Sequence, residues 1–521
     1  MTHWMRLFAL GLFVPSLALA QQPTTPTATL EPAATAGISL QDAISSALAK
    51  NPGYLQWLNN ESPANMAVKS AYATFIPSAS VSGGFNYTGS GSSNFGGTNV
   101  VKTSASVGSN YSIDLAWNLN GQVLNQPGLA RSNLRATKEQ IAAANVQLRA
   151  AVNTAYLNVL QTNARIDVVT QQVARNRVFL DLAKARYQVG QATMLDTRQA
   201  EVTLGQSEVD LLVAKQQNAD ARLELFRLMG VTPPDGFETV ALTDSFPVVE
   251  PSYSLNDLLS TAAEVNPNLK AAVASADASG YNLSSVKSEY FPSLRASANW
   301  SGYTQEYTDE QSLVTQAYAS ASGTAANCTF QNQVIQGLTY GPGGIPGQPN
   351  GGIIPDCNAY SGLNATGTAL DPIVSQQIID ANNTFPWDFT TQPFQIFAGI
   401  SLPIFNGLQR ETRVSQAKAQ RDDATEEVRA QSLLVRSQVT SRYLAIGAAY
   451  KAIGVAEENK AAAADQLRLA QDRYRLGQGT ALELSDAEGA VQRADGTYVD
   501  AIYGFHKAVV ALEEAVGQPL R

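Results

Sequence analysis

The chain contains the same turn-like motif twice. Residues 186–196 read RYQVGQATMLD and residues 473–483 read RYRLGQGTALE, so Arg, Tyr, Gly, Gln, Thr, Leu and an acid recur 287 positions apart. Helix-like patterns flank both motifs, and a glycine between two such patterns marks a turn. The sequence therefore predicts two copies of one strand, helix, turn and helix unit, instead of the several unrelated domains that 521 residues would otherwise suggest.

The two copies differ by one insertion. Their front parts align 215 residues apart, residues 39–52 with 254–267, whereas their back parts align 287 apart. The difference of 72 residues belongs to the second copy, in the Gly- and Pro-rich stretch of about 304–393. We therefore expect a first repeat at 38–230, a linker at 231–253 and a second repeat at 254–521. Cys328 and Cys357 lie in the insertion, where an exported chain favours an oxidised pair over two free thiols.

The N-terminus indicates export. Arg6 precedes an apolar run that ends at Ala18-Leu19-Ala20, which predicts a signal peptide over 1–20, cleaved after Ala20. A flexible leader over 21–37 follows. The net charge of −9 and the lack of a basic block argue against a nucleic-acid partner. After the signal no apolar run approaches the ~20 residues of a spanning helix, so a membrane crossing would require a β-barrel.

Four segments have the alternating pattern of β-strands, near 79–89, 103–117, 294–303 and 394–403. Each has one apolar face and one face of small polar residues, as in Val81 and Phe85 against Ser82 and Asn86. A soluble sandwich also alternates, but its solvated face usually carries more Lys and Glu. Aromatic residues near the strand ends further favour a membrane sheet. Because the smallest closed barrels need about eight strands, copies of the chain must pool their strands.

Long helical patterns follow each strand pair. No proline occurs from Leu408 to Arg473, and these 66 residues would extend about 99 Å as a helix. In the first copy, Pro127 indicates a helix that begins near that residue or is kinked there. Return helices are expected at about 194–229 and 481–516, packed side by side with the outgoing helices as in a coiled coil.

The acids near the turns have two interpretations. Thr193 with Asp196, and Thr480 with Glu483, have the spacing of a helix N-cap, and the second pair fits the capping box in its strict sense. Asp486 has no capping role and would form a carboxylate ring with Asp196 if both faced the axis of an oligomer. Catalysis by paired carboxylates lacks a nucleophile, a metal set or a phosphate-binding loop. We therefore expect no enzyme, no catalytic residue, no metal and no cofactor.

In these features together the chain resembles the TolC family of outer-membrane efflux channels. The resemblance covers Leu40 to Gln518 and includes the repeated RY-x-x-G-x-x-T-x-L-[DE] turns, Leu402 to Gly407 (LPIFNG), and Leu228-Met229-Gly230. It implies an α+β membrane protein, in which a homotrimer forms a 12-stranded β-barrel in the outer membrane and a helical barrel in the periplasm of a Gram-negative-type cell. Such a channel is the passive exit duct of a tripartite efflux or type I secretion system.

The resemblance also implies site residues and partners. The turns would be periplasmic tips that dock a membrane-fusion adaptor, which joins the duct indirectly to an inner-membrane transporter. The gate positions match Asp196, Glu483, Asp486 and Tyr474. The docking positions match Val189, Gly190, Gln191, Thr193, Leu476, Gly477, Gln478, Gly479 and Thr480.

One departure concerns the gate. Gly479 stands where well-known members have an arginine that holds the gate closed, so we expect the link from Tyr474 to Asp196 to remain and the arginine link to be lost. This predicts a leakier resting channel. The insertion would form an extracellular loop that covers the mouth or is an inert elaboration. The alternative function is a periplasmic coiled-coil tether without a pore, and a secreted hydrolase is a more distant rival.

Overall fold

The computed structural model describes residues 37–95, 98–339 and 354–520. The expected signal peptide, its expected cleavage site and nearly all of the expected leader lie outside the described residues. The chain forms two compact units. The first combines residues up to Asn51 with Leu148–Pro251 and Ile446–Val510, and the second contains Pro52–Gln147, Ser252–Ala445 and the residues from Ala511 onward.

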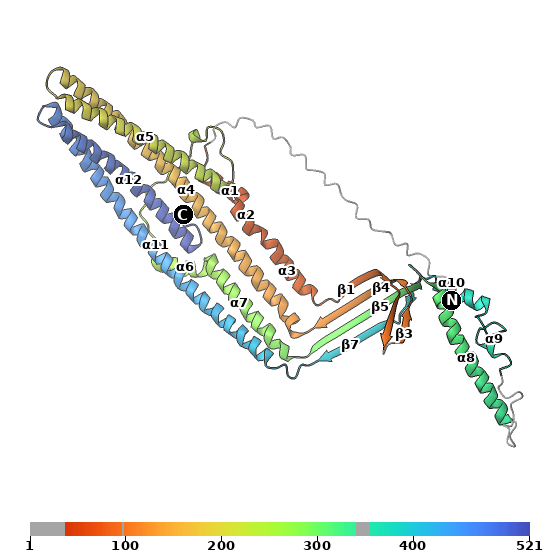
Figure 1. Ribbon diagram of the computed structural model, residues 1–521. Coiled ribbons are helices and arrows are strands. Elements are labelled where there is room, and N and C mark those ends of the chain that lie inside the picture. The colour runs from red at the N-terminus through yellow and green to blue at the C-terminus, as the bar shows by residue number, and fades with distance from the viewer. Residues whose placement is uncertain (1–36, 96–97, 340–353, 521) are drawn as a thin grey trace. The chain divides into compact units, whose positions relative to one another are not determined.

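The two repeats show the same order of elements (Figure 1). Short helices come first, then strands, then a long helix, a turn and a shorter helix. The first copy has α1 (Leu40–Lys50), α2 (Pro52–Asn59), α3 (Glu61–Ala73), β1 (Ser78–Thr88), β2 (Gly91–Phe95), β3 (Thr98–Thr103), β4 (Ser106–Leu119), α4 (Gly121–Gln188) and α5 (Met194–Met229), and the linker contains the short η1 (Phe237–Thr239). The second has α6 (Leu255–Val265), α7 (Pro267–Lys287), η2 (Ser288–Tyr290), β5 (Ser293–Tyr307), α8 (Glu310–Thr339), α9 (Cys357–Tyr360), α10 (Pro372–Asn382), β6 (Thr390–Thr391), β7 (Gln395–Ser401), α11 (Gln409–Arg475) and α12 (Ala481–Val516).

The long helices α4 and α11 contain 68 and 67 residues. Of the two expectations for Pro127, a helix start near this residue was wrong, because α4 begins at Gly121 and contains Pro127, while a kink at Pro127 stays a prediction. Asn120 explains this start, since its side-chain oxygen accepts a hydrogen bond from the backbone of Val123 at 3.0 Å and so caps the first turn. Within the described residues, no helix is long and apolar enough to span a membrane.

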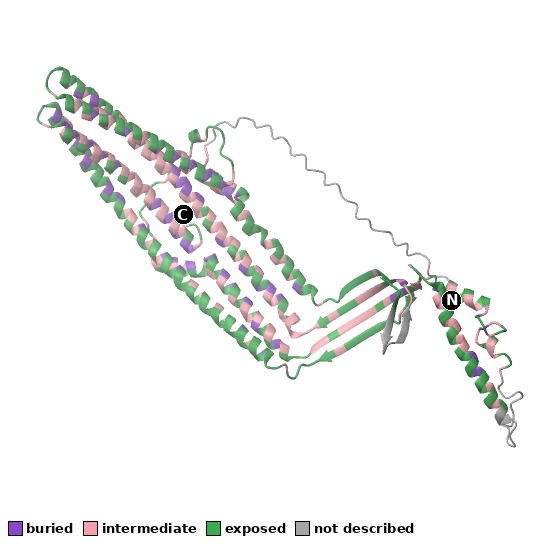
Figure 2. Ribbon diagram, viewed as in Figure 1, coloured by how far each residue is buried: buried purple, intermediate pink, exposed green. Residues whose placement is uncertain are grey.

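The sheet is four strands wide. Antiparallel pairing gives the order β1-β4-β5, and β6 and β7 pair one after the other along the free side of β5. The register aligns the apolar residues of every strand on one face: Val81 opposes Ile113, which opposes Trp300, and Leu115 opposes Ala298, which opposes Ile396. Most strand residues are exposed or half-buried (Figure 2). The sheet therefore presents an uncovered apolar face and two edge strands, β1 and β7.

The insertion is more ordered than the expected loop. Strand β5 extends into it as far as Tyr307, and α8, of 30 residues, follows. A small core of Ala325, Leu363 and Leu370 joins α8 to the chain before α10. The Cys328–Cys357 disulfide links α8 to α9 with a Cα–Cα distance of 5.7 Å. The Ala-, Ser- and Thr-rich composition of α8 has weak apolar periodicity, which explains why the sequence did not indicate a helix here.

Nearly all of the linker belongs to the first unit, where it packs against other segments of that unit. Ile38 forms a parallel bridge with Leu242, and the hydroxyl of the buried Tyr156 lies 2.9 Å from the carbonyl of Ile38 and 3.0 Å from Asp244. Burial raises the pKa of Tyr156 to about 12, so its hydroxyl stays protonated and available as a donor. Gly230 ends α5 with a φ of 71°, and a Cβ there would lie 2.4 Å from the carbonyl oxygen of Lys50. This close approach explains the glycine that closes the first copy.

Candidate functional site

The two helical turns have the same backbone geometry and lie side by side at one end of the first unit (Figure 1). The amides of Gly190 and Gln191 donate to the carbonyls of Tyr187 and Arg186, at 3.0 and 2.8 Å. The corresponding bonds in the second copy are 3.1 Å from Gly477 to Tyr474 and 2.9 Å from Gln478 to Arg473. This pattern is the Schellman motif, which requires a left-handed residue, and the two glycines have φ of 76° and 77°. The RY-x-x-G motif thus encodes a helix end.

The motif arginines stabilise their own turns. A guanidinium nitrogen of Arg186 donates to the carbonyl of Gln191 at 3.3 Å, and Arg473 donates to that of Gln478 at 3.4 Å. Exposed apolar residues occupy the outer surface of both turns. Val189 and Leu476 are 68% and 74% exposed. The turns therefore combine a fixed backbone with an apolar outer surface.

The acids at the two turns make different contacts. The carboxylate of Asp196 accepts hydrogen bonds from the amide and hydroxyl of Thr193, both at 2.8 Å, and Thr193 accepts from the Asp196 amide at 3.2 Å. In the second copy Thr480 accepts from the Glu483 amide at 3.1 Å, but the carboxylate of Glu483 lies 3.7 Å from Arg473. The strict capping box is thus in the first copy, and the expectation that it would be in the second was wrong because Arg473 attracts Glu483.

Tyr474 contacts the side chain of Arg186, and its expected link to Asp196 is not formed. In the described structure the buried Tyr474 hydroxyl has no hydrogen-bond partner, while Asp196 is engaged in its capping box. The guanidinium of Arg186 lies 4.5 Å from the centre of the Tyr474 ring and donates to the Tyr474 carbonyl. Burial raises the pKa of Tyr474; Arg186 opposes this shift and Asp196 adds to it. The first-copy arginine therefore joins the two turns.

Gly479 is packed closely against the preceding helix. A Cβ at this position would lie 3.1 Å from both the Cβ of Arg473 and the amide nitrogen of Tyr474. The turn is therefore built around a residue without a side chain. Asp486 lies one turn further along α12 with an exposed side chain.

A second cross-copy contact lies deeper in the unit. Glu488 of α12 is only 2% exposed, and its carboxylate accepts from Arg175 of α4 at 3.1 Å. Gln471 of α11 is 3.5 Å from the other carboxylate oxygen, and Gln172 accepts from Arg175 at 2.8 Å. Burial raises the pKa of the Glu488 carboxyl above its ordinary value, and Arg175 opposes that shift. The pair thus buries a charge whose lost hydration is compensated mainly by Arg175, with a longer contact from Gln471.

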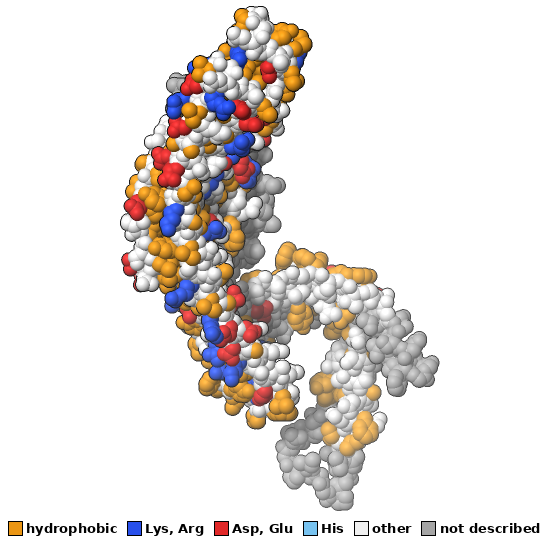
Figure 3. Space-filling view, turned by 90° about the vertical axis from the view of Figure 1, so that its left-hand side faces the viewer, with side chains coloured by type: hydrophobic (Ala, Val, Ile, Leu, Met, Phe, Trp, Pro, Cys, Tyr) orange, Lys and Arg blue, Asp and Glu red, His pale blue; other side chains and the backbone are white. Residues whose placement is uncertain are grey.

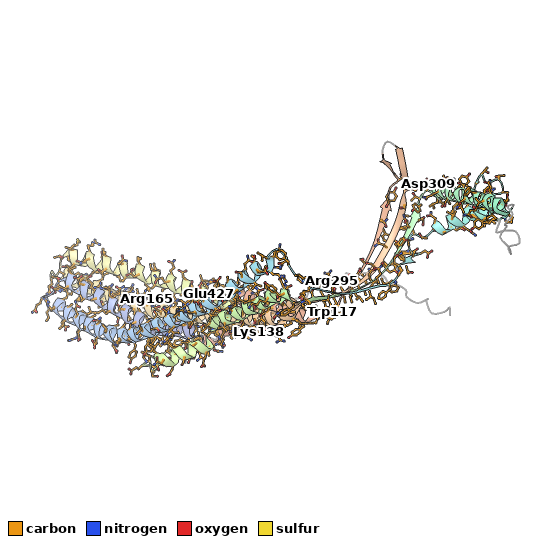
Figure 4. All side chains as sticks on the ribbon, turned by 90° about the horizontal axis from the view of Figure 1, so that it is seen from below. Trp117, Lys138, Arg165, Arg295, Asp309 and Glu427 are labelled. Atoms are coloured by element: carbon orange, nitrogen blue, oxygen red, sulfur yellow. A yellow bond between two sulfur atoms is a disulfide. The ribbon has the colours of Figure 1, made fainter. Side chains whose placement is uncertain are left out.

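A third contact again joins α4 to α12. Arg165 donates to both carboxylate oxygens of Asp500, at 3.1 and 2.5 Å, and Gln161 donates to the same acid at 2.6 Å. Lys507 donates to Gln161 at 2.5 Å. Arg165 lies among the long helices in Figure 4. These polar groups are half-exposed, in contrast to the buried Glu488.

Three arginines of α4 thus form what we name the arginine ladder: Arg165, Arg175 and Arg186. Their spacings of ten and eleven residues are about three helical turns each, which places them on one side of α4. Each binds a residue of the second copy: Asp500, Glu488 and Tyr474 respectively. The ladder could not be read from the sequence, because α4 also contains other arginines and the partners of these three lie far away along the chain.

Among the described residues, no group of three or more His, Cys, Asp or Glu side chains is arranged to hold a metal ion. The cross-copy contacts instead hold helices together. Charged side chains are scattered over the helices of the visible face, while the strand region shows mainly apolar and uncharged atoms (Figure 3).

Comparison with solved structures identifies the fold as that of outer-membrane channels. The chain is similar to the outer membrane protein VceC of Vibrio cholerae, with a TM-score of 0.65 and 15% identity over 92% of this chain and 97% of that one. It is also similar to the MtrE outer membrane channel of Neisseria gonorrhoeae, with a TM-score of 0.63 and 18% identity over 92% and 89% of the two chains.

Sequence comparison then gives the family. The model of the outer membrane efflux protein family matches residues 43–231 and 375–518, and the chain belongs to this family. A stretch of 216 residues is 29% identical to the fusaric acid resistance protein FusA of Burkholderia cepacia, covering 41% of this chain and 39% of that protein. The match thus spans less than half the length of that relative.

Proposed function

We propose that three copies of the chain form one passive efflux duct, in which three four-stranded sheets close a 12-stranded β-barrel in the outer membrane. One observation carries this proposal: the sheet has an uncovered apolar face and two open edge strands. A four-stranded sheet cannot close on itself. Strand β1 of one copy and β7 of the next run in opposite directions when the sheets are placed side by side, so each junction continues the antiparallel order.

The helix pairs of three copies would then form a helical barrel in the periplasm, with the turns as its tips. The arginine ladder holds the two helix pairs of each copy together, so opening the tips requires the contacts of Arg186, Arg175 and Arg165 to separate in that order from the turn inward. In this gate Tyr474 contributes through its contact with the guanidinium of Arg186. Asp196 and Glu483 stabilise the turns, and Asp486 supplies negative charge near the constriction.

The apolar turn residues and the repeated Schellman geometry suit docking of a second protein. We assign this surface to a periplasmic adaptor that connects the duct to an inner-membrane transporter, which supplies the energy. The docking residues are Val189, Gly190, Gln191, Thr193, Leu476, Gly477, Gln478, Gly479 and Thr480. The relative named for fusaric acid resistance makes fusaric acid the first cargo to test.

Disulfide cross-linking of the edge strands tests the assembly. Single cysteines placed along 78–82 of β1 are combined with single cysteines along 397–401 of β7, and the outer membranes are oxidised. We expect at least one combination to give covalent trimers and no larger species, while each single variant gives none. A ladder of species beyond trimers, or no cross-link in any combination, would contradict the closed barrel.

A further inference from the structure

The apolar face of the sheet changes character at the end farthest from the long helices. Over most of its length this face carries residues such as Val81, Ile113 and Trp300. Toward the end that leads to α8, the same face carries Ser109, which opposes Thr304, and then Glu306. Figure 4 places Trp117 and Arg295 at the helix end of the strands and Asp309 at this other end. Polar groups therefore interrupt the apolar face near its far end.

A segment of the insertion covers these polar groups. We name residues 384–389, with sequence TFPWDF, the aromatic strap. The Ser109 hydroxyl is 2.8 Å from that of Thr304 and donates to the Pro386 carbonyl at 2.6 Å. The Glu306 carboxylate accepts from the backbone of Phe385 at 3.1 Å. Ser109 and Thr304 are only 2% and 4% exposed as a result.

Aromatic rings replace the covered polar groups at the surface. The rings of Phe385 and Trp387 meet Phe85 of β1 edge-on at 5.9 and 6.1 Å, and Phe389 meets Tyr111 of β4 at 4.9 Å. Phe85 and Trp387 remain 66% and 71% exposed. The strap thus extends the apolar surface across Ser109, Thr304 and Glu306.

Hydrogen bonds hold the strap to the sheet at its start. The side chain of Asn382, at the end of α10, accepts from the Tyr307 amide at 2.9 Å and donates to the Tyr307 carbonyl at 2.8 Å. The Thr384 hydroxyl donates to the carbonyl of Gln305 at 3.1 Å. These contacts attach the strap to β5 just before it crosses the face toward β1.

We infer that the aromatic strap is a lipid-binding surface that lies at the boundary between acyl chains and headgroups, where it forms the outer limit of the membrane band. The inference rests on the proposed function. Aromatic rings concentrate at this boundary in membrane barrels because their flat, weakly polar surfaces suit both environments. The exposed Asp388 fits the headgroup side, since a carboxylate is costly deeper in the bilayer. The insertion is thereby anchored at the barrel rim by its own return segment.

Tryptophan quenching tests the inference. Trp4 lies in the expected signal peptide, which leaves Trp57 in α2, Trp117 and Trp300 in the sheet, and Trp387 in the strap. Variants that keep one of these four, with the others changed to Phe, are reconstituted in phosphatidylcholine vesicles. The vesicles contain lipid brominated near the headgroup or near the chain ends. Trimers on electrophoresis and conductance in bilayers verify that each variant is assembled.

We expect lipid brominated near the headgroup to quench Trp387 about twofold more than lipid brominated near the chain ends, because the boundary lies close to the headgroups. Trp300 should be quenched by the deeper lipid, and Trp57 only by aqueous iodide. If Trp300 is quenched but Trp387 responds only to iodide, the strap inference is wrong and the barrel stands. If neither responds to brominated lipid, both the inference and the membrane placement fail.

A release variant removes contacts that hold the strap against the sheet. Ser109→Ala removes the bond to Pro386, and Phe85→Ala removes the ring under Phe385 and Trp387. In the Trp387-only chain, this pair should lower lipid quenching and raise iodide quenching while Trp300, in its own background, is unchanged. Unaltered Trp387 quenching in the release variant would overturn the role of the contacts. Shielding of Trp387 from both lipid and iodide would instead place a neighbouring subunit over the strap and would also overturn the inference.

Discussion

At the scale of single residues, Glu488 is the most consequential contact of the arginine ladder. It is almost completely buried, and Arg175 is its charged partner. Removal of one member of such a pair leaves the other charge without compensation. By contrast, Arg177, which lies on α4 like Arg175, pairs with Glu208 of α5, and both side chains are well exposed, at 65% and 50%. The two pairs allow a matched comparison.

Arg175→Ala should destabilise the folded helices by about 3 kcal/mol, the lower end of the range for a broken buried pair. Arg177→Ala, the control, should change stability by at most about 1 kcal/mol. Adding Glu488→Gln to Arg175→Ala removes the orphaned charge and should restore much of the loss. Thermal unfolding followed by circular dichroism measures all four proteins. Equal losses in Arg175→Ala and Arg177→Ala would show that the buried pair has no special role.

The titration of Glu488 gives a pH dependence with a definite sign. Its pKa is raised in the folded state, mainly by burial, so the folded state binds the proton more tightly than the unfolded state does. The contribution of Glu488 to stability therefore falls as pH rises from its ordinary value through the raised one, and recovers on acidification. The melting temperature of wild type should thus fall relative to that of Glu488→Gln as pH rises through this window. A melting temperature of wild type that rises relative to that of Glu488→Gln would contradict the raised pKa of the buried carboxyl.

At the scale of elements, the turn glycines fix how each long helix ends. Gly190 and Gly477 have positive φ, which costs an L-residue roughly 1–2 kcal/mol. Gly190→Ala and Gly477→Ala should each destabilise the protein by about 1 kcal/mol and weaken adaptor binding. Gly205→Ala, in the middle of α5 with open space around it, should instead stabilise the helix by up to about 1 kcal/mol. Thermal unfolding and pull-down with the adaptor are the measurements, and stabilisation by either turn substitution would count against the Schellman assignment.

The sequence allowed the repeat, the strand faces and the turns to be predicted because each has a local signal, namely a recurring motif, a two-residue alternation or a glycine. The helix start expected near Pro127 was wrong because the cap at Asn120 starts the helix earlier, while the alternative, a kink at Pro127, stays a prediction. The arginine ladder depends on residues 288 to 335 positions apart, which no local pattern encodes. The link of Tyr474 to Asp196 was wrong for a related reason, since Arg186 and the capping box compete for these groups.

At the scale of the whole molecule, Asp486 tests whether the turns border a conducting path. Its exposed carboxylate makes no capping contact in the described structure, and a ring of three such groups would attract cations. Asp486→Ala should lower cation conductance and selectivity, whereas Asp196→Asn should act mainly through the stability of its turn. Ion substitution in planar bilayers separates these effects. Unchanged conductance and selectivity in Asp486→Ala would show that Asp486 does not form an acidic ring along the conducting path.

We propose that the chain forms a pore whose tips are held together by contacts between the two repeats within each chain. Single-channel recording of the purified trimer in planar bilayers tests it most directly, with wild type compared against Arg186→Ala and the Arg175→Ala, Glu488→Gln pair. The account predicts discrete openings in wild type and a severalfold higher basal conductance in Arg186→Ala, which loses its cation contact with Tyr474. A protein that forms trimers without any conductance, or variants that conduct no more than wild type, would contradict it.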